Sequence, residues 1–110
     1  MITANIGLNA VALSAGDNTI INLSGSVLRE GVQQAIAHNT TASPVTVNCY
    51  ESPDTTSGSG LLLWSQDIAA NSDEIITGIV GQGFEQGQNL IVNAGGAGVN
   101  LKLTVTRSES

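Results

Sequence analysis

The sequence predicts an all-β fold, an antiparallel β-sandwich or jelly-roll-like domain of about 6–8 strands. Short segments that alternate apolar and polar residues recur along the chain, and turns rich in Gly, Ser and Asn separate them. The clearest strand covers residues 99–106, where Val99, Leu101, Leu103 and Val105 share one face because side chains alternate along a strand. We expect this face to point into the core. The residues expected on its outer face are Asn100, Lys102, Thr104 and Thr106.

Composition narrows the classes of function. A length of 110 residues fits one domain, residues 1–110. Nine acids against three cations give a net charge of −6, which leaves no basic patch for nucleic acid and disfavours anionic membranes. Apolar residues make up 41 % of the chain and are well spread, which argues against disorder. Neither a secretory signal nor an apolar run of about 20 residues is present, so we expect a protein made and assembled in a cytoplasm.

The segment from residue 26 to residue 39 fits two interpretations. It could form a helix that Ser26 caps, or a strand. Gly31 costs a helix about 1 kcal/mol relative to Ala, and the surrounding chain is β-rich, so we favour a strand over residues 32–39. The helical stripe would consist of Val27, Leu28, Val32, Ala35 and Ile36. The strand would place Val32, Gln34, Ile36 and His38 on one face.

Residues 45–50 alternate in the manner of a half-buried strand. Val45, Val47 and Cys49 face one way, and Thr46, Asn48 and Tyr50 face the other. The connection from residues 32–39 is short and turn-rich, residues 40–44, so the two strands are predicted to form a hairpin.

The other expected strands follow from the same alternation and from β-branched residues. They are residues 18–24, 61–68, 74–80 and 89–93. In residues 61–68, one side would hold Leu62, Trp64, Gln66 and Ile68. Residues 51–60 and 81–88 are predicted loops because they are rich in Gly and small polar residues, and residues 107–110 are predicted to be a loose polar tail.

No group of residues in the sequence indicates catalysis. His38 is the only histidine and has no nucleophile motif beside it, so we expect no catalytic residue. Asp67, Asp73 and Glu74 bracket one turn and could bind a hard cation, but solvated acids are the simpler interpretation. The glycines of residues 81–87 lack the spacing of a phosphate-binding loop. We therefore predict no metal and no cofactor.

The cysteine and the aromatic residues favour structural roles. Cys49 is the only cysteine, so no intramolecular disulfide can form, and its position on an apolar face predicts a buried thiol. Tyr50, Trp64 and Phe84 are the only aromatics. They could form a carbohydrate platform if exposed together, but scattered aromatics more often belong to a core or an interface.

Two stretches carry a resemblance to a known group of proteins. One runs from Ala35 to Thr41 and continues from Pro44 to Tyr50, and the other runs from Asn89 to Val105. Their order resembles small β-sandwich virion proteins of tailed bacteriophages, where a strand ending in Asn-Thr leads through a turn into a Val-Thr-Val strand. In that group a Gly-rich turn followed by a Val-x-Leu-x-Val strand closes the domain.

The resemblance implies a non-enzymatic structural virion protein that decorates or cements a capsid. The implied partners are the major capsid protein or other virion proteins, together with further copies of the chain, and the implied location is the virion. Alternatives are a small neck, tail or fibre component, or a carbohydrate-binding module for a host surface. The residues proposed for an interface are His38, Tyr50, Asn100 and Thr104.

Overall fold

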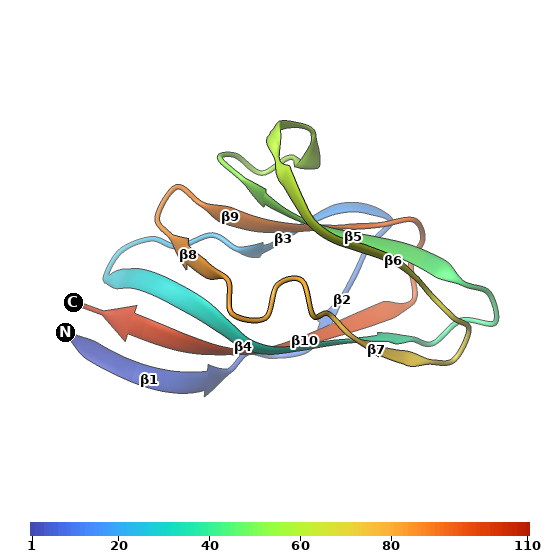
Figure 1. Cartoon of the computed structure of the whole chain (residues 1–110), viewed down its shortest axis with the longest axis horizontal. Coiled ribbons are helices and arrows are strands. Elements are labelled where there is room, and N and C mark those ends of the chain that lie inside the picture. Colours follow the sequence, from blue (N-terminus) through green and yellow to red (C-terminus); the bar gives the residue numbers. More distant parts are fainter.

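The computed structural model describes residues 1–110, which form two stacked sheets whose strand pairs are all antiparallel (Figure 1). One sheet has six strands, with β2 and β8 beside the path β1-β10-β4-β7. Its strands are β1 (Ile2–Gly7), β2 (Val11–Ala12), β4 (Val27–Asn39), β7 (Asp73–Ile75), β8 (Gly83–Glu85) and β10 (Val99–Glu109).

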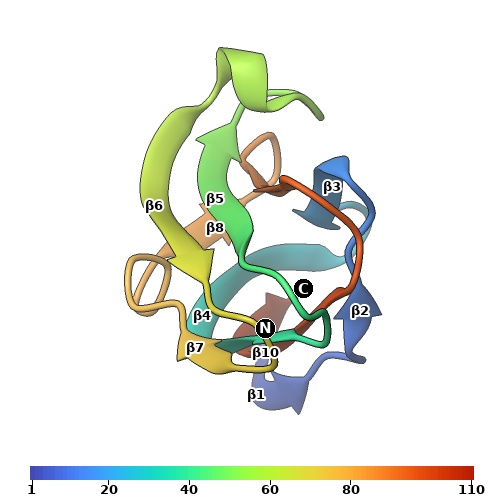
Figure 2. The same cartoon turned by 90° about the vertical axis from the view of Figure 1, so that its right-hand side faces the viewer.

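The other sheet has four strands in the order β3-β9-β5-β6. Its strands are β3 (Gly16–Ile21), β5 (Val45–Ser52), β6 (Leu61–Ile68) and β9 (Asn89–Ala94), and the short 3-10 helix η1 is Ser57–Ser59. Figure 2 shows β5 and β6 in one layer and β4, β10 and β1 in the other. The predicted all-β antiparallel sandwich is therefore confirmed, with ten strands because several are only two or three residues long.

The core lies between the sheets and has the predicted composition on β10. Val99, Leu101, Leu103 and Val105 are all buried, as expected from their two-residue spacing. Burying branched side chains on one face is the main favourable term for a sandwich of this size. From the opposite sheet, the predicted inward face of β5 is also buried: Val45, Val47 and Cys49.

The predicted hairpin between residues 32–39 and 45–50 is wrong. β4 lies in the six-stranded sheet beside β10, whereas β5 lies in the four-stranded sheet between β9 and β6. Residues 40–44 are a crossover between the two layers. β4 pairs mainly with the distant strand β10, and β5 pairs with β9 and with the strand that follows it, β6, so a short connection did not imply pairing.

Residues 32–39 lie in a strand, as favoured, and this strand begins earlier, at Val27, but the predicted face is wrong beyond Val32. A bulge at Gln33 separates two regular register segments, since Val32 lies opposite Val105 and Gln34 lies opposite Thr104. The extra residue moves every following side chain to the other face. The inward residues after the bulge are Ala35, Ala37 and Asn39, while Ile36 is only partly buried and His38 is exposed.

A second bulge corrects the side assigned to Leu62. Trp64 lies opposite Cys49 and Leu62 lies opposite Tyr50, so Leu63 is the extra residue in β6. Directly opposed residues share a face, which places Trp64 on the core side and Leu62 on the outer side.

The predicted strand over residues 74–80 ends early, at Ile75. Turns follow, and they still bury Ile76 and Ile79 completely. Gly78 approaches β6 so closely that a Cβ atom there would lie 2.6 Å from both the Leu63 carbonyl oxygen and the Trp64 Cβ. A β-branched sequence can therefore form a buried turn where one residue without a side chain allows the close approach.

Two segments predicted to be irregular contain strand. Residues 83–85, in the expected Gly/Gln loop, form β8 against β4. Residues 107–109, in the expected loose tail, continue β10, and the Ser110 amide donates to the Ser26 carbonyl at 2.9 Å. The strand extends because its partners β1 and β4 are long enough to pair with it.

Candidate interaction site

The four residues predicted for an interface do not converge on one site. His38 and Asn100 lie opposite each other on β4 and β10, on the outer face of the six-stranded sheet, and both are exposed. Thr104 lies further along β10, opposite Gln34, and Tyr50 belongs to the other sheet. The role of these residues in an interface stays a prediction.

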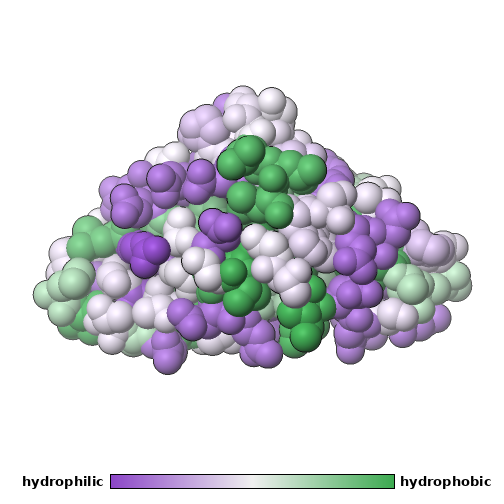
Figure 3. Space-filling model, in the orientation of Figure 1, coloured by the Kyte–Doolittle hydropathy of each residue, from purple (hydrophilic) through white to green (hydrophobic).

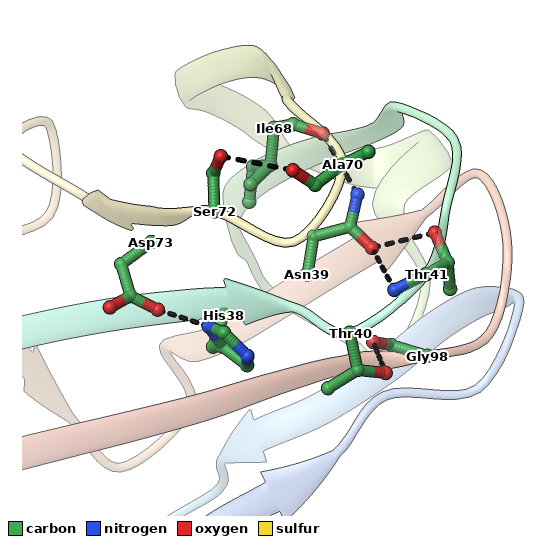
Figure 4. A network of polar contacts seen from close by, with 9 residues as sticks. All are labelled: His38, Asn39, Thr40, Thr41, Ile68, Ala70, Ser72, Asp73 and Gly98. Carbon is green, nitrogen blue, oxygen red and sulfur yellow. Dashed lines mark hydrogen bonds and ion pairs between the residues drawn. The ribbon is translucent and has the colours of Figure 1, made fainter.

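His38 is part of a cross-strand pair. Its Nδ1 contacts Asp73 Oδ1 on the neighbouring strand β7 (Figure 4). The nearby hydroxyl of Ser72 donates to the Ala70 carbonyl at 3.1 Å. This contact therefore links β4 to β7 as a cross-strand side-chain pair.

Asn39 anchors the crossover from β4 to β5 (Figure 4). Its Nδ2 donates to the carbonyl oxygens of Ser43 at 2.8 Å and Ile68 at 3.0 Å. Its Oδ1 accepts from the amide and the hydroxyl of Thr41 at 2.9 and 2.7 Å. A buried amide with every hydrogen bond satisfied is a structural feature, and it fixes where the chain leaves the six-stranded sheet.

The three acids that could have bound a cation have separate environments. Asp67 accepts from the Thr46 hydroxyl at 2.5 Å, Asp73 contacts His38, and Glu74 is partly buried. No group of three or more His, Cys, Asp or Glu side chains is arranged to hold a metal ion.

Cys49 and the aromatics are placed mainly by packing. Cys49 is fully buried, and burial raises the pKa of its thiol to about 12. Phe84 is fully buried on β8, whereas Trp64 and Tyr50 are partly buried in the other sheet. The three rings belong to different sheets or faces, so they do not form a common platform for a sugar.

A pocket that the sequence did not indicate opens between β3 and the connection from β1 to β2. Its volume is about 260 Å³, and we call it the end pocket. Five apolar residues line it: Leu8, Ile20, Ile21, Leu23 and Val27. The lining also contains Asn22, Ser24 and the ion pair of Glu30 and Arg107. An open apolar pocket at the surface is a candidate binding site.

The ion pair of the end pocket spans neighbouring strands. Arg107 on β10 lies opposite Glu30 on β4, and both occupy inward positions at the end of the sandwich. Arg107 Nε donates to Glu30 Oε2 at 2.6 Å. The Glu30 side chain is only 4 % exposed and that of Arg107 is 26 % exposed, so the pair has one buried member and one that reaches the pocket. A buried carboxylate requires such a partner.

Local sequence could not reveal this pair. Residues 107–110 appeared to be a tail, and 77 positions separate Glu30 from Arg107. One signal was present: Arg107 continues the inward alternation of Val99, Leu101, Leu103 and Val105, so a longer strand would have placed a cation at the end of the core.

Two edge strands lack the features that usually prevent association. β6 contains one charged residue, Asp67, and β1 contains none; neither contains Pro. Long edges without Lys or Pro tend to pair with other chains. At the start of β6, Leu61 and Leu62 are 66 % and 50 % exposed, and Ile75 on β7 is 58 % exposed. Figure 3 shows apolar side chains gathering over the start of β6 and over the segment between β7 and β8.

Comparisons with known proteins give one informative similarity. No protein-family model matches the chain, and no curated protein matches it. Among solved structures, the chain is similar to a protein of Bacillus endospore appendages, described as a family of disulfide-linked pili. The TM-score is 0.57 at 13 % identity, over 98 % of this chain and 87 % of that one. At this identity the similarity concerns the fold alone.

The similar structure and the elements of the fold bear on the expected role and on membrane-spanning segments. The similar protein is described as belonging to a family of pili, and the similarity shows a shared all-β fold, whereas a structural role and capsid decoration remain predictions. None of the elements is a helix long and apolar enough to span a membrane.

Proposed function

We propose that this protein is a non-enzymatic structural subunit that associates with further copies of itself through its sheet edges. The observation that carries the proposal is the edge of β6, where Leu61 and Leu62 are exposed and no Lys or Pro blocks pairing. An isolated sandwich exposes such an edge to water, whereas an assembly would pair it and bury its leucines.

The similar solved structure supports an assembly of the pilus type. A shared fold is compatible with many functions, so the similarity raises the expectation of a polymer without fixing it. The disulfide linkage described for that family does not extend to Cys49, because this thiol is buried in the core. We therefore propose that Cys49 forms no disulfide between copies of this chain.

Capsid decoration, the role implied by the sequence resemblance, is the second form of the proposal. It needs the same exposed edges, but the partner would be a coat protein on a virion rather than another copy. The two forms differ in the behaviour of the isolated chain. A pilus-like subunit forms assemblies by itself in solution, whereas a decoration protein stays unassembled until its coat protein is present.

Sedimentation velocity and negative-stain electron microscopy over a range of concentrations test the proposal. We expect assemblies whose mass rises with concentration and does not change on addition of a reducing agent. Leu62→Lys, which places a charge on the open edge, should shift the protein toward the monomer. Thr55→Lys, at an exposed loop position, is the matched control and should assemble like the parent protein.

A parent chain that sediments as a monomer at every concentration would contradict self-assembly. In that case, mass spectrometry of purified phage particles decides the decoration form: absence of the chain, or only one or two copies per particle, would remove it.

A further inference from the structure

The exposed leucines of β6 and the end pocket lie in one transverse row of the four-stranded sheet. Ile21 on β3 is opposite Leu90 on β9, Leu90 is opposite Glu51 on β5, and Glu51 is opposite Leu61 on β6. Leu61 on the edge strand β6 and Ile21 on the edge strand β3 therefore lie at the same position along the strand direction. Ile21 also lines the end pocket.

The two edges run in opposite directions. Each neighbouring pair in the path β3-β9-β5-β6 is antiparallel, and four strands give three reversals, so β3 and β6 are antiparallel to each other. The path β1-β10-β4-β7 has the same property. A second copy placed beside the first in the same orientation would thus bring antiparallel edges together in both sheets.

Pairing β6 of one copy with β3 of the next brings Leu61 to the pocket. Along the shared row, Leu61 would approach Ile21 of the second copy on the inner face, where the pocket lies, whereas Leu62, opposite Tyr50, points to the outer face. Leu61 and Leu62 are exposed at the β6 edge of the four-stranded sheet, whereas the end pocket opens at the β3 edge. Leu61 of one molecule therefore cannot reach the pocket of the same molecule.

The size of the end pocket fits aliphatic side chains. Its 260 Å³ exceed the roughly 150 Å³ of an apolar cavity that holds one benzene molecule. They fall short of the roughly 300–1,000 Å³ typical of small-molecule sites. Because five of its nine lining residues are hydrophobic, an aliphatic side chain such as that of Leu61 is a better match than a polar ligand.

Charge also differs between the two surfaces. Glu51 lies directly opposite Leu61, and Asp54 follows in the next loop, so acids flank the leucines. The end pocket contains Arg107, whose side chain is 26 % exposed. Glu30 neutralises this guanidinium inside the same pocket, so the acidic leucine surface meets a pocket without net charge and is not repelled by it.

We infer that the end pocket of one copy receives Leu61 of a second copy, with β6 of that second copy pairing along β3. The inference rests on the proposed self-association and names its two surfaces. Because these surfaces differ, the contact is heterologous and can repeat without a limit set by symmetry. The twist between adjacent strands rotates each copy relative to the last, so repetition gives a helical filament or a ring.

Two variants separate the surfaces. Leu61→Gln/Leu62→Gln removes the leucines at exposed positions and leaves the pocket intact. Ser24→Trp fills the pocket from an exposed lining position and leaves the leucines intact. Gln34→Ala is the control, since it changes an exposed residue on the outer face of β4, which lies inside the six-stranded sheet and away from both edges. Thermal melting and sedimentation velocity are recorded for each variant, alone and mixed.

We expect both surface variants to melt like the parent chain and to lose its assemblies, while Gln34→Ala keeps them. An equimolar mixture of the two surface variants should form a one-to-one heterodimer and nothing larger, because only one leucine surface and one pocket remain usable. Ser24→Trp that assembles like the parent protein, or a mixture without the heterodimer, would overturn the inference. If the parent chain assembles and all three variants do so equally, the proposed function stands and this contact does not.

Discussion

Arg107 places two guanidinium nitrogens, Nε and Nη2, on a single oxygen of Glu30, each at 2.6 Å. Two short contacts to one carboxylate oxygen, with the Glu30 side chain almost wholly buried, make this pair the strongest electrostatic constraint on the end of the sandwich. Removing one member leaves the other without a partner, and the consequence depends on which member remains.

Arg107→Leu should destabilise the fold because it leaves the Glu30 carboxylate buried and unpaired. The cost of breaking a buried pair is about 3–5 kcal/mol, and the partial exposure of Arg107 places the expected loss near the lower end. Replacing both residues, with Glu30→Met added to Arg107→Leu, should recover most of the loss. Urea denaturation of the three proteins measures it; a double variant as unstable as Arg107→Leu would contradict the prediction.

Gly78→Ala should destabilise the protein, because the new Cβ would lie 2.6 Å from the Leu63 carbonyl oxygen and the Trp64 Cβ. Backbone atoms of a paired strand cannot move away cheaply, so a cost of about 1–3 kcal/mol is expected. Gly96→Ala is the control, since nothing lies within 4 Å of the Cβ added there. Equal melting temperatures for the two variants would show that the turn after β7 does not press on β6.

Leu101→Ala and Leu103→Ala should each cost about 2–5 kcal/mol, because both side chains are buried between the sheets. Asn100→Ala, on the outer face of the same strand, should change the free energy of unfolding of the isolated chain by about 0.5 kcal/mol or less. Chemical denaturation compares the three. A similar loss from Asn100→Ala would mean that the outer face of β10 is also packed.

The ionised carboxylate of Asp54 stabilises the folded protein, and this stabilisation is lost at acidic pH. Hydrogen bonds from the hydroxyl and the amide of Thr56 lower the pKa of the Asp54 carboxyl from 3.8 to about 2. A carboxyl whose pKa is lower in the folded state stabilises it above the unfolded pKa, and this stabilisation is lost as the pH falls through the folded pKa.

The parent chain should therefore melt at a higher temperature than Asp54→Asn, and this difference should be largest above about pH 4 and should shrink as the pH falls toward about 2. Thermal melts at several pH values between these limits measure it. Thr55→Ala, in the same loop without a titrating group, should differ from the parent protein by the same amount throughout. A gap for Asp54→Asn that stays constant down to pH 2 would mean that these hydrogen bonds do not favour the ionised form.

Alternation predicted the structure well where strands pair without interruption. The inward residues of β10 and β5, and the bounds of β6, follow directly from a two-residue period and flanking turns. The bulges at Gln33 and Leu63 made the predicted faces wrong, because one extra residue in a strand is recognised only when the strand is aligned with its partner. Gly78 likewise gave no local sign that it lies against another strand.

The candidate interaction site was less predictable than the fold. The end pocket combines residues from the connection after β1, the end of β3 and the connection that follows it, the start of β4 and the end of β10. Their proximity depends on which strands pair across the whole chain, and the incorrect hairpin shows that neighbouring strands in sequence need not pair. The exposure of Leu61 and Leu62 depends on β6 being an edge, which local pattern does not reveal either.

The position of β10 in the middle of the six-stranded sheet has a consequence for how the chain folds. β10 pairs with β1, β2 and β4, and β5 with β6 is the one pair of strands that is consecutive in the sequence. A chain with so few local contacts must close long loops before it gains stabilising contacts, so folding should take milliseconds to seconds rather than microseconds. During synthesis, β1 and β4 have no central strand to pair with until residues 99–109 leave the ribosome, so the six-stranded sheet forms only after β10 has emerged.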